Sequence, residues 1–266
     1  MGIKRRRARS SGLGLPLLAL LLLLAPACGD DDPTEPPPGN GAHVRVDVRY
    51  TVNGRPLELE TGRYLAASGD SFYVSRVRHY LTNFQFTSAD TNFVDTRLHY
   101  VDAEQLPTLR FLIPNVPRIE YVSLAFLIGL DDARNRLGGI AEPTLDDLNM
   151  EWPIPLGGGY HNIQIEGFYW REGVARRPFN AHLGRAQESP SQGTPYINHN
   201  VPVLLRDVVF TETDGARSLS LEMEIDQWFR TPQVYDFATW GNFIMDRHEP
   251  QQILRENAAD AFNVAR

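Results

Sequence analysis

Histidine is the residue type in this chain with the clearest capacity for chemistry. The sequence holds seven histidines and a single cysteine, Cys28. Imidazole nitrogens bind copper and zinc, and the lack of thiolates excludes the commonest structural zinc sites. The sequence has no Cys-His zinc spacing and no His-Glu-x-x-His helix, so a metal site would have to be assembled from separate segments. Four histidines lie in runs typical of strands and are the candidate ligands: His79, His99, His161 and His182.

For each of these histidines, a hydrogen-bonded structural role is the alternative to metal binding. His161 alternates in step with Ile163 and Ile165, and His79 alternates in step with Val77, as core residues of a strand do. Several such histidines in one domain without thiols nevertheless favour a shared nitrogen site.

The stretch "EWPIPLGGGYHNIQIEGFYW", residues 151–170, places Trp152 and His161 on either side of three glycines. A phosphate-binding loop needs a strand before it, a helix after it and a Lys-Ser/Thr pair. Here the glycines are followed by alternating apolar and polar residues, which predicts a strand. The glycines therefore indicate a turn, and Trp152 becomes an aromatic neighbour for a site at His161, with core packing as the alternative.

The sequence offers little support for catalysis. It has no Gly-x-Ser-x-Gly elbow and no cysteine pair, and the acidic pairs Asp131-Asp132 and Asp146-Asp147 lie in loop-like segments, where carboxylates are usually solvated. We therefore expect a binding protein and not an enzyme.

The elements that must position these side chains are mainly strands. "HVRVDVRY" alternates strictly, and the long "FYVSRVRHYLTNFQF" alternates imperfectly, which predicts a bulged strand. Pro250 fits the first turn of a closing helix whose apolar stripe comprises Leu254, Ala258, Ala261 and Phe262. These patterns predict an all-β fold, an antiparallel β-sandwich or barrel-like domain with a short C-terminal helix.

The N-terminal residues are typical of an export signal. A basic segment precedes the apolar run from Leu15 to Leu24. The residues that follow this run, up to Cys28, resemble a bacterial lipobox. We expect residues 1–27 to be a signal peptide and Cys28 to be lipidated, with simple cleavage near Ala27 as the alternative.

Residues 28–41, rich in acids, prolines and glycines, are expected to form a disordered linker that carries the lipid anchor, before a single domain over residues 42–266. Removal of residues 1–27 with their five basic residues lowers the formal charge from -7 to -12. So acidic a domain is unsuited to nucleic acid.

An ordered set of segments carries a resemblance to a known family. It runs through "VSRVRHYLTNFQFT", "LHYVDAEQ", "YVSLAFLIGLDDARNRLGG", "LDDLNMEW", "GYHNIQIEGFYW", "FNAHLG", "EIDQWF" and "FIMDRHEPQQILRENAADAFNV". In this order the segments resemble the MbnP-like family, copper-binding periplasmic or outer-membrane proteins associated with methanobactin operons and found more widely as lipoproteins.

The resemblance implies a β-sandwich-like domain that binds copper outside the cytoplasm. His99 matches the histidine of the family's Tyr-His-Leu-x-Asp-Ala run, and His182 matches that of its His-x-Gly-Gly run. Trp152 matches the first tryptophan of its Met-x-Trp-x-Trp run, a residue type that a di-haem partner of the MbnH type oxidises to kynurenine in some relatives. The second tryptophan of that run is replaced here by Ile154.

We therefore expect a lipoprotein of the outer membrane, facing the periplasm or the cell surface, that stores, scavenges or delivers copper. His99 and His182 would hold copper, as Cu(I) rather than Cu(II), with Trp152 nearby and His161 or His79 as a replacement ligand. The membrane would be contacted through the lipid alone. The alternative is a surface interaction or ligand-binding sandwich without a metal, using the aromatic "FYWREG" segment.

Overall fold

The computed structural model describes residues 41–173, 175–206, 208–213 and 216–265. The expected signal peptide, the lipidated Cys28 and the linker up to residue 40 lie outside these ranges. The first strand begins at Gly41, one residue before the predicted start of the domain. No helix among the described residues is both long and apolar enough to cross a membrane.

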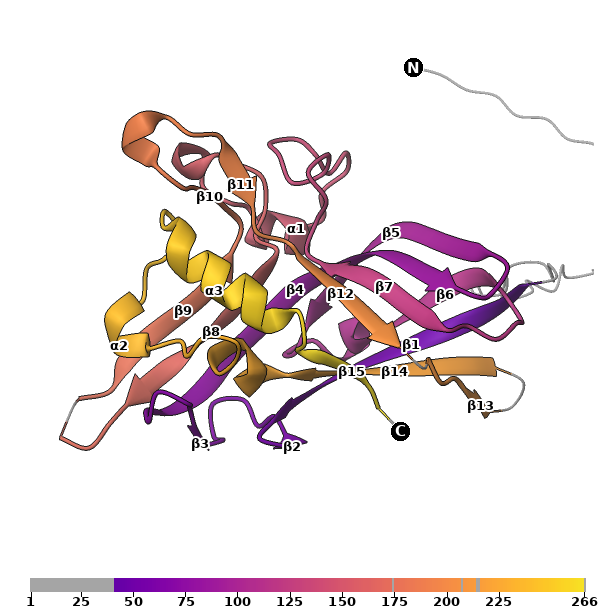
Figure 1. Ribbon diagram of the computed structural model, residues 1–266, viewed down its shortest axis with the longest axis horizontal. Coiled ribbons are helices and arrows are strands. Elements are labelled where there is room, and N and C mark those ends of the chain that lie inside the picture. The colour runs from indigo at the N-terminus through magenta and orange to yellow at the C-terminus, as the bar shows by residue number, and fades with distance from the viewer. Residues whose placement is uncertain (1–40, 174, 207, 214–215, 266) are drawn as a thin grey trace, which may run out of the picture. The chain divides into compact units, whose positions relative to one another are not determined.

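Two β-sheets supply the inner faces of one hydrophobic core (Figure 1), so the predicted sandwich is confirmed. The first sheet has the order β13-β14-β1-β2, with β15 alongside β14 and β6 alongside β1. Its strands are β1 (Gly41–Val52), β2 (Arg55–Pro56), β6 (Arg110–Pro117), β13 (Thr211–Thr213), β14 (Ala216–Glu224) and β15 (Phe262–Val264).

The second sheet has the order β12-β7-β4-β8-β9, with β3 and β5 also pairing with β4. A separate two-stranded ribbon, β10-β11, stands beside it. These strands are β3 (Tyr64–Leu65), β4 (Ser71–Thr87), β5 (Asn92–Asp102), β7 (Ser123–Ile128), β8 (Ile163–Trp170), β9 (Arg177–Leu183), β10 (Arg185–Gln187), β11 (Tyr196–Asn198) and β12 (Val201–Arg206).

Strand pairing follows the sequence pattern, except for one parallel pair of strands that the pattern did not predict. The alternating residues Val44, Val46 and Val48 of β1 are buried, as predicted, and pack in the core. Strand β4 shifts register between Val74 and Arg76, so its imperfect alternation does mark a bulge. Strands β1 and β14, from opposite ends of the domain, pair in parallel, whereas the other pairs are antiparallel.

The predicted C-terminal helix is present as α3 but ends earlier than its apolar stripe. Pro250 lies in its first turn, and the last helical residue is Ala258. Phe262 instead belongs to β15, where its ring meets that of Phe126 at a centroid distance of 5.2 Å. The helical segments are α1 (Leu145–Asn149), α2 (Phe237–Trp240), α3 (His248–Ala258), η1 (Leu106–Leu109), η2 (Ile154–Leu156), η3 (Pro190–Gln192) and η4 (Ile225–Phe229).

Candidate metal centre

A glycine-rich hairpin loop, residues 151–160, brings Trp152 next to the start of β8. The three glycines have φ angles of 100°, 62° and 97°, in the left-handed region that other residues rarely adopt. The amide N–H of Trp152 donates to the carbonyl of Gly159 at 2.8 Å, and Glu151 bridges to Tyr160. The glycines therefore form a turn, as predicted, and the two arms of the turn carry Trp152 and His161.

His161 and His182 meet at the end of strands β8 and β9. Their rings are nearly perpendicular, at 88°, with centroids 4.9 Å apart. Residue 161 precedes the first residue of β8, so the strand alternation that predicted a common direction with Ile163 does not extend to it. Its ring instead reaches the face of the sheet from which His182 projects.

Hydrogen bonds fix the tautomers of both rings. The Nδ1 of His161 lies 3.0 Å from the carbonyl oxygen of Met150, which can only accept, so Nδ1 carries the proton. The Nε2 of His182 lies 3.1 Å from the Glu166 carboxylate, so Nε2 carries the proton there. The opposite nitrogens, Nε2 of His161 and Nδ1 of His182, are buried without a hydrogen-bond partner. Each therefore presents a free lone pair, which is what a metal ion requires.

The electrostatic environment keeps His161 neutral. Burial is the main cause that lowers its pKa to about 3, and the neighbouring His182 ring contributes to this shift. The hydrogen bond from His182 is the main cause that lowers the pKa of Glu166 below its usual range. A carboxylate behind the distal N–H of a histidine orients the ring and raises its basicity, an arrangement common around bound metals.

Trp152 closes one side of this pair. Its ring packs edge to face with that of His161 at a centroid distance of 4.7 Å, and its indole N–H donates to the carbonyl of Leu156 at 3.0 Å. The indole lies so close to Gly184 that a Cβ there would approach the ring carbon Cε3 to 2.2 Å. Glycine after His182-Leu183 is therefore needed to seat Trp152 in its buried position.

Three asparagines, two of them buried, hold the surrounding loops together. Asn135 and Asn162 both donate to the side-chain oxygen of Asn198 at 2.8 Å, and Asn135 also accepts the amide N–H of Tyr160 at 2.7 Å. This network ties the loop that carries His161 to two segments distant in sequence. Sequence reasoning missed it, because asparagine in loop-like segments reads as a turn residue.

The structure does not bring His99 to the pair. The strand register places His99 on the face that packs against the first sheet, whereas His182 projects from the other face. The His99 ring stacks on Phe111 at 3.9 Å, and its Nε2 lies 3.4 Å from Asp95. Burial lowers its pKa, while Asp95 acts in the opposite direction. The expected pair of His99 and His182 is therefore not formed.

His79 also lies apart, in the apolar space between the sheets. Its Nε2 is 2.9 Å from the hydroxyl of Tyr50 on β1, and its ring meets that of Phe262 edge to face. Complete burial lowers its pKa to about 4. Of the five predicted site residues, the structure thus gathers three: Trp152, His161 and His182.

A second histidine pair was not predicted from the sequence. Nε2 of His199 lies 3.1 Å from Nδ1 of His248, the first residue of α3. The amide N–H of His199 donates to the carbonyl of Gly184, so this pair lies close to the glycine that seats Trp152. The two rings are hydrogen-bonded to each other, so this pair does not expose two free lone pairs.

The donor set of the site is small. Within the described ranges, no three His, Cys, Asp or Glu side chains are arranged to hold a metal ion. Two neutral imidazole nitrogens beside an aromatic ring fall short of the four protein ligands of structural zinc. Imidazole donors of this kind suit copper. The residues present therefore fit a copper ion of low coordination number.

Comparisons with known proteins agree with this architecture. Among curated proteins, none matches the chain significantly. The solved structure of MbnP from Methylosinus trichosporium is similar, with a TM-score of 0.51 and 16% sequence identity over 84% of this chain and 98% of that one. At this identity the likeness concerns the fold. The family model for MbnP matches residues 41–246, which is well over half of the sequence. This chain therefore belongs to the MbnP family.

Proposed function

We propose that this protein is an extracytoplasmic copper-binding lipoprotein that stores, scavenges or delivers copper and is not itself an enzyme. The observation that carries the proposal is the pairing of His161 and His182, whose hydrogen bonds leave one free lone pair on each ring. Membership of the MbnP family and the association of that family with methanobactin operons support the choice of copper.

Cu(I) fits this pair better than Cu(II). Both rings are buried, and at a buried site an ion of lower charge loses less hydration energy. The His161 ligand is neutral, because burial is the main cause that lowers its pKa to about 3. A Cu(II) site normally adds ligands in a tetragonal arrangement, and the described residues supply no such set.

Trp152 is the candidate for oxidation to kynurenine by a di-haem partner of the MbnH type. Its ring is the direct neighbour of His161, so a change in the indole would alter the immediate surroundings of the bound ion. Its single indole hydrogen bond goes to a carbonyl of the same hairpin loop. The modification would therefore act on a ring that the chain already holds next to the copper ligands.

Export and anchoring through Cys28 would place this site outside the cytoplasm, on an outer membrane contacted by the lipid alone. The acidic linker and the charge of -12 on the processed chain suit a soluble periplasmic or surface environment and make nucleic acid an unsuitable partner. Mass spectrometry of the purified protein tests the anchor, because a diacylglyceryl group on the Cys28 sulfur, with or without a third acyl chain on its amino group, adds a defined mass.

Copper stoichiometry tests the metal proposal. The processed protein is exposed to Cu(I) under reducing conditions, desalted and analysed for copper and protein. We expect about one copper per chain, loss of that copper in the double variant His161→Ala/His182→Ala, and retention in the matched control His199→Ala/His248→Ala. Equal copper in both double variants would refute the ligand assignment.

A further inference from the structure

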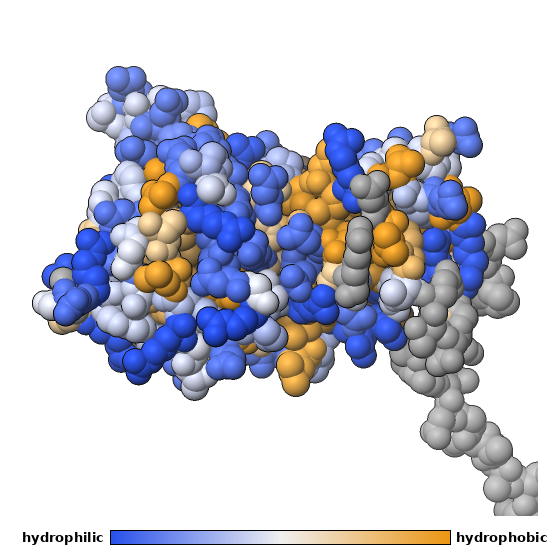
Figure 2. Space-filling view, turned by 60° about the horizontal axis from the view of Figure 1, so that its bottom comes forward, coloured by the Kyte–Doolittle hydropathy of each residue, from blue (hydrophilic) through white to orange (hydrophobic). Residues whose placement is uncertain are grey.

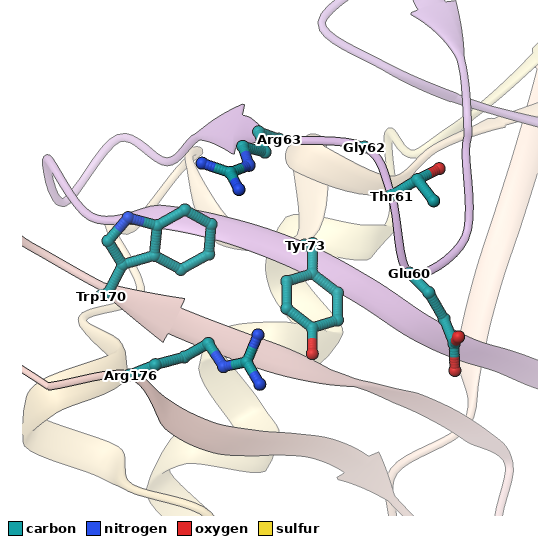
Figure 3. Close-up of a pocket in the computed structure, with 7 residues that line it drawn as sticks. All are labelled: Glu60, Thr61, Gly62, Arg63, Tyr73, Trp170 and Arg176. Carbon is teal, nitrogen blue, oxygen red and sulfur yellow. The ribbon is translucent and has the colours of Figure 1, made fainter.

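A second feature of the molecule lies at the end of the sheet that carries β3 and the neighbouring ends of β4, β8 and β9. A solvent-open cavity of about 470 Å³ is present there (Figure 3). The residues lining it come from the loop before β3, from β4, from the end of β8 and from the start of β9: Glu60, Thr61, Gly62, Arg63, Tyr73, Trp170 and Arg176.

The floor of this cavity is aromatic. Tyr73 of β4 lies directly opposite Phe168 of β8 in the strand register, and their rings stack at 5.4 Å with an interplanar angle of 23°. Trp170 follows on the same face of β8, 6.3 Å from Tyr73. Figure 3 shows the rings of Trp170 and Tyr73 side by side. Half-buried rings of this kind offer flat apolar faces that are held firmly in place.

Two arginines flank this floor. The Arg63 guanidinium lies 5.9 Å from the Trp170 ring centroid, and the Arg176 guanidinium lies 4.8 Å from that of Phe168. In Figure 3 they approach from opposite sides of the aromatic rings. Within the described part of the chain, neither has a hydrogen-bond or ion-pair partner, whereas Arg78 and Arg171 nearby each bind a buried carboxylate. Unpaired guanidiniums held on aromatic faces are ready to bind an anion.

The aromatic floor continues into a neighbouring hollow. A second cavity of about 550 Å³ shares Arg63 and Trp170 with the first, and its lining includes Asn53 and Arg55. Arg55 likewise has no ion-pair or hydrogen-bond partner among the residues described. The two cavities are adjacent, because both are lined by Arg63 and Trp170, and together they are called the trough below. A ligand that reaches both cavities must be elongated.

The remaining groups select the kind of anion. Glu60 and Thr61 also line the cavity and offer a carboxylate and a hydroxyl, both of which can bind ligand hydroxyls. The Glu60 carboxylate repels a densely charged phosphate. On the face drawn in Figure 2, the end of the molecule that carries β3 is mostly hydrophilic, and the larger apolar patches lie towards the opposite end. A ligand rich in hydroxyls with spaced carboxylates matches this surface, and a lipid surface does not.

We propose that the trough binds an acidic oligosaccharide, a chain of carboxylate-bearing sugars. The sugar rings pack against the side chains of Trp170 and Tyr73. Their carboxylates accept hydrogen bonds from the Arg63 and Arg176 guanidiniums that lie over those rings, in the paired geometry that guanidinium groups favour. The proposal stands apart from copper binding, since none of the lining residues contributes to the His161–His182 pair.

Isothermal titration calorimetry of the processed protein tests the proposal, with a tetragalacturonate probe, a neutral tetrasaccharide of equal length and inorganic phosphate. We expect saturable binding of the uronate alone, and affinity reduced about tenfold or more in Arg63→Ala/Arg176→Ala, because charge-assisted hydrogen bonds are lost. Arg247→Ala is the matched control, because it removes an arginine stacked on Trp240 outside the trough and should bind like the parent protein.

Each other outcome overturns the proposal. Equal binding of the neutral sugar would show that the arginines do not select the ligand. Binding of phosphate at the same affinity would show a general anion surface, and an equal loss in Arg247→Ala would show a non-specific charge effect. The Trp170→Ala variant tests the aromatic floor of the cavity. Circular dichroism and copper stoichiometry show whether this variant is folded. Failure of the uronate to bind the parent protein refutes the proposal and leaves the copper proposal unaffected.

Discussion

The His161–His182 pair and His79 are alike in burial, yet their surroundings differ. All three side chains are buried, and burial lowers the pKa of His161 and of His79. His79 has one partner, the Tyr50 hydroxyl, which can donate or accept, so its tautomer is not fixed. His161 and His182 donate to groups that only accept, and their free nitrogens belong to neighbouring rings. A candidate ligand site is thus marked by free lone pairs on two neighbouring rings rather than by burial or a lowered pKa.

Acid should lower the free energy of unfolding through both His161 and His79. In the unfolded chain these imidazoles take up a proton near pH 6.5, whereas the folded pKa is about 3 for His161 and about 4 for His79. Between the folded and the unfolded pKa, the unfolded state binds more protons than the folded state. The free energy of unfolding therefore has its full value above pH 6.5 and falls as the pH decreases towards 4. Each group contributes on the order of 3 kcal/mol to this loss.

Urea unfolding of the metal-free protein between pH 7 and 4 measures this effect. His161→Gln and His79→Gln should each flatten the profile, while bound copper at pH 7 is lost only in the first variant. A pH profile unchanged by either substitution would contradict the buried, neutral state of these rings.

Gly184→Ala should disrupt the metal site from a position that binds no metal. The added Cβ would collide with the Trp152 indole, and overpacking of this kind typically costs about 1 to 3 kcal/mol. We expect a lower free energy of unfolding together with weakened copper binding, measured by denaturation and by elemental analysis. Gly193→Ala is the control for lost stability alone. Its positive φ of 66° strains an alanine, but the added Cβ meets nothing within 4 Å, so copper binding should stay at the parent value. Parent-like copper affinity in a folded Gly184→Ala protein would show that the placement of Trp152 does not matter.

His79→Leu sharpens the contrast by removing the core histidine. The Tyr50 hydroxyl would be left buried without a partner, at a cost of about 1 to 3 kcal/mol in the free energy of unfolding. Combining His79→Leu with Tyr50→Phe should recover part of this loss, because both polar groups are then gone. Copper stoichiometry should stay at the parent value in both variants, and its loss would place His79 among the ligands.

The smallest effect is expected for His99→Phe. Phenylalanine keeps the stack on Phe111 and gives up only the 3.4 Å contact with Asp95, so the free energy of unfolding should change by less than about 1 kcal/mol. Bound copper should remain unchanged. If copper were lost in this variant, the residue matched through the family resemblance would be the better ligand assignment, and the geometric one would fail.

The sequence was sufficient for much of the fold, because strict alternation in β1 and the bulged pattern of β4 are local signals. It did not predict the parallel pairing of β1 with β14, which joins residues about 170 positions apart. The predicted end of the C-terminal helix was also wrong. Phe262 follows the apolar periodicity of α3, yet it belongs to β15 and pairs with β14.

The site could be predicted in part. Trp152, His161 and His182 were candidates by residue type, but their meeting depends on a hairpin loop that ends strand alternation before Ile163. His99 matches the histidine of the family's Tyr-His-Leu-x-Asp-Ala run. Only the strand register shows that its side chain lies on the opposite face of the sheet from His182. His199 gave no signal, because its partner is at the start of α3, 49 residues further along the chain.

Nitrogen-15 NMR of the histidine rings would test the copper assignment most directly, in protein titrated with Cu(I) and assigned by single His→Gln variants. Before copper, His161 should be the Nδ1–H tautomer and His182 the Nε2–H tautomer. On copper addition, Nε2 of His161 and Nδ1 of His182 should shift, while the resonances of His79, His99 and His199 stay in place. Opposite tautomers, or a copper-induced shift at one of those other rings instead, would contradict the proposed site.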